Sequence, residues 1–338
     1  MEKASLLSFV SLTDGQLSKL QAVSPHLEIL QQPEARAADL SEEVRRRVEI
    51  LYGQKPSMLD AHLFPRLKWI QLNSAGFDYM RSNPVWQLDL PITTVRGIHI
   101  IPVSELALAL IFAFRWKLRD LLRFQARAEW PQNRWEIFFV PELYGSTIGI
   151  VGYGVIGREL ARQAQALGMR VLVVNHSGRR YPMRDEISST VGDPEAAIPE
   201  KIYPTSGLLD MLPECDYVVA VAPSTDQSRH LFDTEAFAQM KRSAVFINVG
   251  RGALIDEAAL IAALCQGQIA GAGLDVFEEE PLPASSPLWQ MDNVILSPHI
   301  GGISARHHDR ACEVLAENLR RYFHHEPLLN LVDRVRGY

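Results

Sequence analysis

The chain has 338 residues, of which 47% are hydrophobic and 22% charged, and it carries a formal net charge of -6 at pH 7. This length exceeds that of an ordinary single core and favours two domains, and the composition is that of a globular rather than a disordered protein. The small excess of negative charge, without a block of like charges, argues against nucleic acid or an anionic membrane surface as the main partner.

Cysteine usage and apolar runs bear on location. Cys215, Cys265 and Cys312 are scattered without paired spacing, which indicates thiols in a reducing cytoplasm rather than a disulfide frame or a zinc site. Met1–Val10 lacks the basic start, apolar run and cleavage site of a signal peptide. The longest uncharged apolar run, Leu106–Phe114, is about half of the roughly 20 residues that span a bilayer. We therefore expect a soluble, cytoplasmic protein without a bound metal ion.

Short aliphatic runs alternate with helix-forming segments through the first hundred residues. Alternation at this spacing predicts βαβ units around a parallel sheet, and therefore a small α/β domain. Helices are expected at Thr13–Val23, where Thr13 is a suitable N-cap, and at Ser41–Arg47. The expected strands are Leu6–Val10, Leu27–Leu30, Val48–Tyr52, Trp69–Leu72 and Ile92–Val95.

The middle of the chain contains a long apolar segment. Val103–Arg119, introduced by Pro102, predicts a single helix. The segment 130–141 that follows is rich in tryptophan and proline, and its apolar run Ile137–Val140 suits an ordinary buried strand; a second interpretation depends on the resemblance described below. Further on, Arg184–Leu212 matches neither pattern and is interpreted as a surface insertion.

Beyond residue 146 the alternation of strands and helices resumes more strongly. The expected helices Arg158–Leu167 and Asp256–Cys265 should end at Gly168 and Gly267, which suit the left-handed residue after a helix. A last helix, Ala305–His324, has no strand partner, so we expect it to fold back onto the first domain. The expected strands are Thr147–Val151, Arg170–Val174, Tyr217–Ala222, Ala244–Val249, Ile269–Leu274 and Val294–Ser297.

A glycine-rich turn lies between the first of these strands and its helix. Gly152, Gly154 and Gly157 have the spacing of a dinucleotide-binding turn. The first permits the tight turn, the second lets the backbone approach a pyrophosphate, and the third allows close packing of helix and strand. The amides at the helix start, including those of Val155 and Ile156, should then face the phosphates. A plain turn is the alternative, which the flanking strand and helix disfavour.

The next strand ends without the carboxylate that usually binds the ribose hydroxyl of NAD. It runs into Asn175–His176–Ser177–Gly178–Arg179–Arg180. A carboxylate would repel a 2′-phosphate, whereas Arg179 can pair with it bidentately, helped by the Ser177 hydroxyl. We therefore predict that the cofactor is NADP(H) in preference to NAD(H). A solvated basic loop is the alternative interpretation.

Three polar side chains of the carboxyl half also follow strand ends. Arg251 follows one expected strand, Glu280 another and His299 a third. Ligands of an open parallel sheet bind outside the carboxyl ends of its strands, so we expect these groups to meet. Taken singly, Arg251 suits an ordinary structural cap, Glu280 a solvated loop and His299 a surface histidine. Their shared position favours a functional site over these alternatives.

These segments, together with the glycine-rich turn and Val103–Leu106, resemble the D-isomer-specific 2-hydroxyacid dehydrogenase family over nearly the whole chain. The resemblance implies an α/β fold, with a Rossmann-type, doubly wound coenzyme domain inserted into a discontinuous, flavodoxin-like substrate domain. We expect residues 1–101 and 301–338 to form the substrate domain and residues 102–300 the NAD(P)-binding domain. This arrangement would explain the unpartnered C-terminal helix.

The resemblance also implies an NAD(P)-dependent oxidoreductase that acts on the CH–OH group of 2-hydroxy acids and, in reverse, reduces 2-oxo acids. Arg251 would bind the substrate carboxylate and ketone oxygen with its planar fork. His299 would donate a proton to the developing alkoxide, since an unperturbed imidazole titrates near about 6.5, and reduction should fade at higher pH. Glu280 would orient the His299 ring and favour its charged form.

The same resemblance assigns further contacts. The amides of Ala75 and Gly76, beside Ser74, would hold the substrate carboxylate from the other domain, and Asp275 would hold the nicotinamide carboxamide or its ribose. In relatives the segment 130–141 crosses a dimer axis, which implies a homodimer. The complete predicted coenzyme set is Gly152, Gly154, Val155, Ile156, Gly157, Asn175, Ser177, Arg179, Arg180, Ala222, Pro223, Val249, Gly250, Asp275 and Gly301.

The identity of the acid is weakly encoded. Phosphoglycerate-oxidising relatives tend to carry basic residues where this chain has Leu51–Gly53 and Leu72–Ser74. A phosphate without a cationic partner in a cleft is poorly compensated, which favours a small, unphosphorylated acid such as glyoxylate or hydroxypyruvate. The alternatives are a phosphoglycerate dehydrogenase-like enzyme, a formate- or phosphonate-type dehydrogenase, and an NAD(P)-sensing protein like the corepressors that share this fold.

Overall fold

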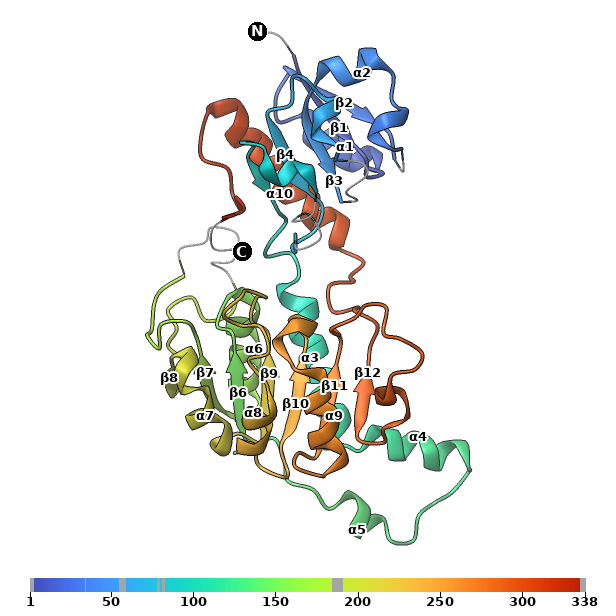
Figure 1. The fold of residues 1–338 in the computed structure, drawn as a ribbon, viewed down its shortest axis with the longest axis vertical. Helices are drawn as coiled ribbons and strands as arrows, with labels where there is room; N and C mark the ends of the chain where they lie inside the picture. Colours follow the sequence, from blue (N-terminus) through green and yellow to red (C-terminus); the bar gives the residue numbers. More distant parts are fainter. Residues whose placement is uncertain are drawn as a thin grey trace. The chain divides into compact units, whose positions relative to one another are not determined.

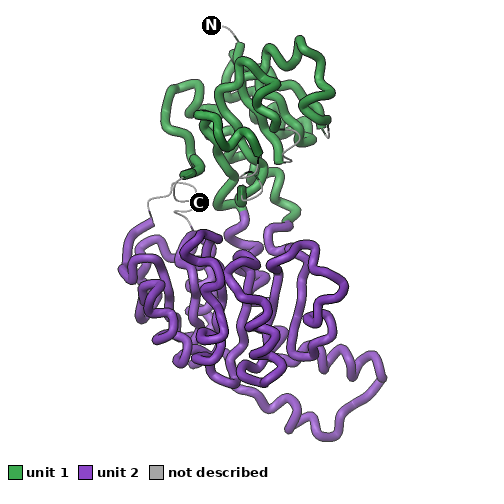
Figure 2. Tube along the Cα trace, viewed as in Figure 1, with its two compact units in different colours: residues 1–98, 304–338 green, residues 99–303 purple. Residues whose placement is uncertain are grey.

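The computed structural model describes residues 3–33, 35–54, 59–77, 80, 83–183 and 191–334. The chain forms two compact units, unit 1 (residues 1–98 and 304–338) and unit 2 (residues 99–303) (Figure 2). The boundaries fall at 98/99 and 303/304 rather than at the predicted 101/102 and 300/301. The first boundary falls there because His99 is the N-cap of helix α3 (Ile100–Arg115), so the whole helix belongs to unit 2.

The described part of unit 1 contains a five-stranded parallel sheet with the order β2-β1-β3-β4-β5 (Figure 1). This order is that of flavodoxin-like doubly wound folds, as the resemblance implies. The predicted strands are found, although the first lies two residues earlier and the last ends at Thr93. The strands are β1 (Ala4–Ser8), β2 (Leu27–Gln31), β3 (Val48–Gly53), β4 (Trp69–Leu72) and β5 (Ile92–Thr93).

Among the residues of unit 1 that the structure describes, three α-helices pack on this sheet or flank it. Helix α1 (Asp14–Gln21) begins at the predicted N-cap Thr13, which forms a capping box with Gln16. Helix α2 (Glu42–Arg47) begins after Ser41, whose side chain accepts a hydrogen bond from the Val44 amide. The C-terminal helix α10 (His307–His324) belongs to unit 1 and packs against α1.

Helix α10 contributes a fully buried row to the core of unit 1. Cys312, Leu315 and Leu319 lie in one cluster with Leu20 of α1 and Trp69 of β4. Polar contacts add to this apolar packing, since the Asn318 amide nitrogen donates to the Gln71 side chain across 2.9 Å. The last helix therefore forms part of the same hydrophobic core as the first hundred residues.

Within the described residues, unit 2 contains a parallel sheet of seven strands in the order β12-β11-β10-β9-β6-β7-β8. Chain order reverses between the neighbouring strands β6 and β9. A reversal of this kind opens a ligand-binding crevice outside the carboxyl ends of the strands. The strands are β6 (Thr147–Val151), β7 (Arg170–Val174), β8 (Lys201–Tyr203), β9 (Tyr217–Ala220), β10 (Val245–Asn248), β11 (Gly271–Leu274) and β12 (Val294–Leu296).

Helices cover both faces of this sheet, so its strands are apolar on both sides. Side chains alternate between the faces: Ile150 packs in the cluster that contains α3 and α6 (Val155–Ala166), and Val151 packs in the opposite cluster. That second cluster contains side chains of α7 (Leu208–Met211), α8 (Thr234–Gln239) and α9 (Glu257–Cys265). No helix among the described residues is long and apolar enough to cross a membrane.

The predicted single helix Val103–Arg119 is wrong at both ends. Helix α3 begins earlier, at Ile100, and ends at Arg115. Lys117 then adopts a left-handed conformation with φ of 47°, which no continuous α-helix contains, and α4 (Leu118–Ala126) starts after it.

The segment after α4 contains no strand at Ile137–Val140, so the buried-strand interpretation is wrong. It forms the short helix α5 (Arg134–Phe138), and Trp135 and Phe139 are 75% and 86% exposed. Together α4 and α5 extend away from the rest of unit 2 (Figure 1). With no neighbouring strand to pair with, the apolar run has no sheet to join.

The interpretation of Arg184–Leu212 as a surface insertion is also wrong for the residues that the structure describes. Residues 191–212 contribute the edge strand β8, and they bury Asp193, Met211 and Leu212 in unit 2. The strand has only three residues and is followed by Pro204, which hides it from a pattern search. Residues 184–190 lie outside the described residues.

The role of α10 in the core can be tested by truncating a buried side chain. Leu315→Ala should destabilise the protein by about 2–5 kcal/mol, because it removes methyl groups from a packed site and leaves a cavity. The urea-induced unfolding transition should therefore begin at a lower urea concentration. Glu313→Ala is the control, since this exposed side chain only pairs with Lys19 on the surface and should change little. Equal effects of the two substitutions would contradict this packing.

Candidate active site

The glycine-rich turn between β6 and α6 has the close contacts that its sequence predicts. Gly152 has a φ of 108°, and a Cβ atom added there would lie 2.6 Å from the backbone nitrogen of Ala222. A Cβ at Gly157 would lie 2.1 Å from the Gly152 carbonyl oxygen. Only glycine fits both positions, so the turn brings the backbone of β6, β9 and α6 into contact.

Helix α6 begins directly in this turn, at Val155, with Gly154 as its N-cap. It starts three residues before the predicted Arg158. The amides of Val155 and Ile156 consequently lie in the first turn, where helical amides lack an intrahelical acceptor. Such amides, at the positive end of a 12-residue helix, can hold a pyrophosphate.

The loop after β7 is shaped by Asn175, whose side chain is buried. Its Oδ1 accepts hydrogen bonds from the amides of Ser177 at 3.1 Å and Gly178 at 2.7 Å, and its Nδ2 donates to the Arg179 carbonyl at 2.9 Å. This side chain therefore fixes the shape of the loop, and its contact with the coenzyme stays a prediction.

The two arginines of this loop have different surroundings. The Arg180 guanidinium donates to the carbonyls of Ala196 and Pro199, and its contact with the coenzyme stays a prediction. Arg179 is exposed, and its guanidinium has no hydrogen bond or ion pair with any described residue. Arg179 therefore remains the guanidinium that can receive a 2′-phosphate, beside the Ser177 hydroxyl.

The ends of β9 and β10 adjoin the glycine turn. Ala222 and Pro223 follow β9, and Val249 and Gly250 follow β10. The Val249 amide donates to the Ala220 carbonyl at 3.2 Å, and a Cβ at Gly250 would lie 3.1 Å from the Ala222 carbonyl oxygen. The predicted coenzyme residues from these strands therefore lie at one edge of the sheet.

Arg251 stands at the same edge. One terminal guanidinium nitrogen donates to the Gly250 carbonyl at 2.8 Å, and the Arg251 carbonyl accepts from the Asn248 side chain at 3.0 Å. A Cβ at the next residue, Gly252, would lie only 1.8 Å from the Phe277 carbonyl oxygen. The loop of Arg251 thus touches the backbone of the loop that follows β11.

His299 and Glu280 form a hydrogen-bonded pair. Nδ1 of His299 lies 2.6 Å from Oε2 of Glu280, and Oε1 of Glu280 accepts from the Phe277 amide at 3.0 Å. Both side chains are partly exposed. With Nδ1 engaged by the carboxylate, Nε2 is the ring nitrogen that remains to face a ligand. Arg251, Glu280 and His299 follow the adjacent strands β10, β11 and β12, so they share one edge.

Asp275 fixes the loop that carries His299. Its side chain is 2% exposed and accepts three hydrogen bonds: from Ser297 Oγ at 2.6 Å, and from the amides of Ile300 at 2.9 Å and Gly301 at 2.8 Å. Its carbonyl accepts from the His299 amide at 2.9 Å. The buried carboxylate therefore positions the histidine loop, and its contact with the coenzyme stays a prediction.

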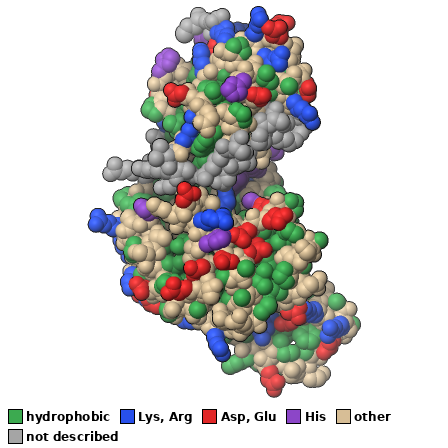
Figure 3. Space-filling model, in the orientation of Figure 1, with side chains coloured by type: hydrophobic (Ala, Val, Ile, Leu, Met, Phe, Trp, Pro, Cys, Tyr) green, Lys and Arg blue, Asp and Glu red, His purple; other side chains and the backbone are tan. Residues whose placement is uncertain are grey.

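A second histidine–carboxylate pair at this edge was not anticipated from sequence. Nε2 of His230, in the loop after β9, lies 2.5 Å from Oε1 of Glu278. Burial raises the pKa of the nearby Glu257 carboxyl, and the charges of Glu278 and Glu279 raise it further. Figure 3 shows acidic side chains gathered with histidine and basic ones on one face of unit 2. No local signal in the sequence marked His230, because it lies well beyond the end of β9 at Ala220.

The predicted substrate loop lies in unit 1, after the carboxyl end of β4. Ser74, Ala75 and Gly76 are half-buried, and Ser74 Oγ donates to the Gly76 carbonyl at 2.8 Å. The preceding Asn73 accepts a hydrogen bond of 2.6 Å from the buried Tyr52 hydroxyl. This loop therefore has a defined shape within its own unit.

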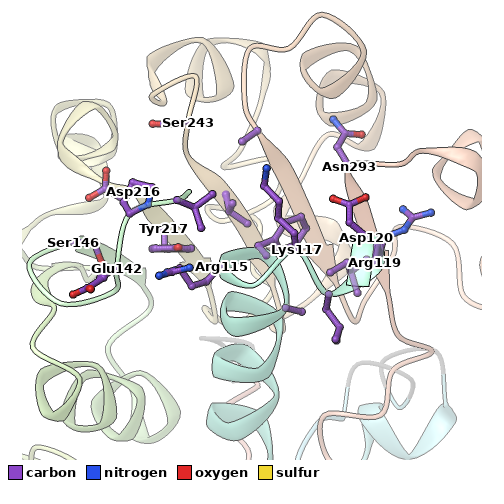
Figure 4. A pocket seen from close by; sticks show the side chains of 18 of the residues that line it. Arg115, Lys117, Arg119, Asp120, Glu142, Ser146, Asp216, Tyr217, Ser243 and Asn293 are labelled. Atoms are coloured by element: carbon purple, nitrogen blue, oxygen red, sulfur yellow. The ribbon is translucent and has the colours of Figure 1, made fainter. Parts of the chain in front are cut away.

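A cavity of about 620 Å³ opens at the opposite edge of the unit 2 sheet (Figure 4). Ser146, Asp216, Ser243 and Asn293 line it, and each of them precedes a strand rather than following one. None of the predicted site residues is in its lining. This cavity is separate from the candidate site.

Comparison with known proteins identifies the family. Residues 108–301 match the profile of the D-isomer specific 2-hydroxyacid dehydrogenase, NAD binding domain. The chain is 34% identical to a glyoxylate reductase of Thermococcus onnurineus over 296 residues, which cover 86% of this chain and 84% of the relative. It is 33% identical to glyoxylate/hydroxypyruvate reductase B of Salmonella paratyphi A over 321 residues, 92% of this chain and 93% of the relative.

A solved structure gives the same result. The D-isomer specific 2-hydroxyacid dehydrogenase of Xanthobacter autotrophicus Py2, in complex with NADPH and MES, matches with a TM-score of 0.76 and 30% identity over the full length of both chains. Profile, sequence and structure agree on the family and on its fold. The chain belongs to the D-isomer specific 2-hydroxyacid dehydrogenase family and is an NAD(P)-dependent oxidoreductase that interconverts 2-oxo acids and 2-hydroxy acids.

Proposed function

We propose that this enzyme is an NADPH-dependent reductase of small, unphosphorylated 2-oxo acids such as glyoxylate or hydroxypyruvate. The observation that carries the proposal is the His299–Glu280 pair, hydrogen-bonded at 2.6 Å at the strand edge that Arg251 shares. The relatives named glyoxylate reductase and glyoxylate/hydroxypyruvate reductase support the substrate class.

The proposed chemistry assigns one role to each of the three side chains. Bound NADPH supplies a hydride to the carbonyl carbon of the substrate. His299 donates its Nε2 proton to the carbonyl oxygen, on which negative charge develops, and Glu280 stabilises the charged ring through Nδ1. Arg251 binds the substrate carboxylate and polarises the ketone oxygen with its planar guanidinium. We keep the prediction that Ser74 and the amides of Ala75 and Gly76 also bind the carboxylate.

Charge around the loop after β7 supports the preference for NADP(H). No carboxylate follows β7; the position is taken by Asn175, which is neutral and already hydrogen-bonded within the loop. Arg179 can form charge-assisted hydrogen bonds with a 2′-phosphate. The similar enzyme of Xanthobacter autotrophicus Py2 is a complex with NADPH, which agrees with this assignment.

The preference for an unphosphorylated acid is argued from the segments that end β3 and β4. Leu51–Gly53 and Leu72–Ser74 contain no basic residue, and a phosphate held without a cationic partner loses much of its hydration energy uncompensated. A small acid needs only the groups that bind its carboxylate and carbonyl.

The enzyme is further proposed to act as a homodimer through α4 and α5. Trp130, Trp135 and Phe139 are exposed large apolar side chains of one extended segment, and Leu118 and Leu122 of α4 are exposed as well. Exposed large apolar side chains concentrated on one segment are typical of an interaction site. An isologous interface, the commonest arrangement, would pair this surface with its copy.

A cytoplasmic location is proposed from cysteine chemistry. Cys215 and Cys312 are buried free thiols, and Cys265 is exposed and free. Burial raises the pKa of the Cys215 thiol to about 12, so it is unreactive as well as unpaired. Free thiols of this kind suit a reducing compartment.

The proton-donor role of His299 is tested by His299→Gln. Loss of a general acid should lower kcat for reduction by a factor on the order of 10²–10⁴, while the dissociation constant for NADPH, measured by fluorescence titration, stays near the wild-type value. His324→Gln, at an exposed position of α10, should leave both quantities unchanged. A variant at position 299 with full activity would refute the assignment.

The substrate and coenzyme are tested together by steady-state assays of a panel of 2-oxo acids with NADPH and with NADH. Glyoxylate or hydroxypyruvate should give the highest kcat/KM, and NADPH should be preferred over NADH. Better turnover of 3-phosphohydroxypyruvate, or of formate or phosphite in the oxidative direction, would support the alternative dehydrogenases. Coenzyme binding without turnover of any acid would instead favour a sensor.

Arg179→Ala is the matched variant for the coenzyme preference. It should lower kcat/KM for NADPH by about tenfold or more, because a charge-assisted hydrogen bond to the phosphate is lost, and leave kcat/KM for NADH unchanged. Equal losses with both coenzymes would show that Arg179 does not contact the 2′-phosphate.

The dimer is tested by size-exclusion chromatography with light scattering. The wild-type protein should have twice the mass of one chain, and Leu122→Glu should give a monomer because it buries a charge in the apolar interface. Leu331→Glu, an exposed position in unit 1, is the control and should remain dimeric. A monomeric wild-type protein would rule the dimer out.

A further inference from the structure

A buried arginine lies directly behind the glycine turn and takes no part in the proposed chemistry. Arg158 follows Gly157 and is 1% exposed. Its guanidinium donates to the Asp193 carbonyl at 2.6 Å and the Tyr181 carbonyl at 2.8 Å, and it lies 4.9 Å from the centre of the Tyr153 ring. A buried charge is tolerated only when it is hydrogen-bonded, so these carbonyls have a fixed place relative to the turn.

The Asp193 carboxylate makes a second connection to the same turn. It accepts hydrogen bonds from the amides of Ala197 at 2.8 Å and Ile198 at 2.9 Å, and from the hydroxyl of Tyr153 at 2.6 Å. Tyr153 stands between the first two glycines of the turn. Burial, together with the Asp193 carboxylate, raises the pKa of the Tyr153 phenol, so the hydroxyl remains a donor.

The segment that Asp193 organises also anchors the coenzyme loop. Arg180 donates to the carbonyls of Ala196 and Pro199, and the Met183 amide donates to the Pro194 carbonyl at 2.8 Å. Residues 193–199 are thus bonded on one side to the glycine turn and on the other to residues 180–183. The chain of contacts runs from the pyrophosphate turn to the residue next to Arg179.

We propose that Tyr153, Arg158 and Asp193 are positioning residues for coenzyme discrimination. They set the distance between the turn that binds the pyrophosphate and the loop that presents Arg179 to the 2′-phosphate. The side chains are 2%, 1% and 5% exposed, so none of them contacts the coenzyme itself. This inference rests on the proposed preference for NADP(H).

The network should affect the two coenzymes differently. Both dinucleotides carry the pyrophosphate, but only NADPH carries the group that Arg179 receives. A guanidinium held in place loses less freedom on binding than one on a loosely held loop. Loosening the network should therefore raise KM for NADPH more than KM for NADH.

Tyr153→Phe removes only the hydroxyl that joins the turn to Asp193. We expect the ratio of kcat/KM for NADPH to that for NADH to fall by about tenfold or more, as for one lost hydrogen bond to a charged group, through KM for NADPH. Tyr181→Phe is the matched control: it also removes one hydroxyl, but Arg158 uses only the ring and the carbonyl of Tyr181, so the ratio should stay unchanged. A fall of similar size in both variants would overturn the proposal.

Asp193→Asn provides an independent readout in the full-length enzyme. It should speed hydrogen–deuterium exchange in the peptide that contains Ala197 and Ile198, and lower the same coenzyme ratio. Faster exchange with an unchanged ratio would mean that the network is merely structural, and would overturn the inference. The wild-type ratio is measured first, because an enzyme that prefers NADH would contradict the proposed coenzyme and this inference together. A wild-type preference for NADPH that Tyr153→Phe leaves intact would overturn this inference alone.

Discussion

The parallel arrangement of the strands in unit 2 is the constraint on which its site depends. Parallel strands deliver every loop that follows a strand to one edge, and the reversal of chain order between β6 and β9 leaves space there for a ligand. The glycine turn follows β6, the arginine-bearing loop follows β7, and Arg251 follows β10. Glu280 and His299 follow β11 and β12. The sheet alone therefore brings groups that lie far apart in sequence to one edge. No direct contact between these groups is required.

Two buried aspartates fix the conformations of loops whose approximate positions are set by the sheet. Asp275 holds the loop of His299, and Asp193 holds the segment on which Arg180 rests. Each carboxylate accepts three hydrogen bonds, two from backbone amides and one from a hydroxyl. A carboxylate that accepts three hydrogen bonds fixes loop geometry more firmly than apolar packing, which is non-directional. The rigid sheet and these two carboxylates together define the site within unit 2.

The loop after β7 illustrates how one residue, Asn175, determines several contacts. With Asn175 after β7, the side chain can both accept from two amides and donate to a carbonyl, which a carboxylate cannot do. The loop then closes on itself, and the Arg179 side chain is exposed. Arg180 points the other way, onto backbone carbonyls. Neighbouring arginines of identical chemistry thus have different roles.

The sequence by itself determined the α/β class, most strand positions and the glycine turn, and it singled out Arg251, Glu280 and His299 as candidate site residues. These follow from local signals: the period of apolar residues, the glycines that a turn requires, and the position of polar side chains after strands. Periodicity also predicted α10, although its location in the core of unit 1 depends on contacts such as the one from Asn318 to Gln71, 247 positions apart.

Only the tertiary structure decided the break between α3 and α4 at Lys117 and the strand β8. It also decided three sets of contacts: those of Arg180 with backbone carbonyls, the three hydrogen bonds that the Asp275 side chain accepts, and the pairing of His230 with Glu278. Each of these depends on a partner distant in sequence or on the packing of a short segment against its neighbours. The Tyr153–Asp193 hydrogen bond, for example, joins residues 40 positions apart. Local patterns specify which groups are available, whereas hydrogen bonds formed on folding decide which of them remain free to bind a ligand.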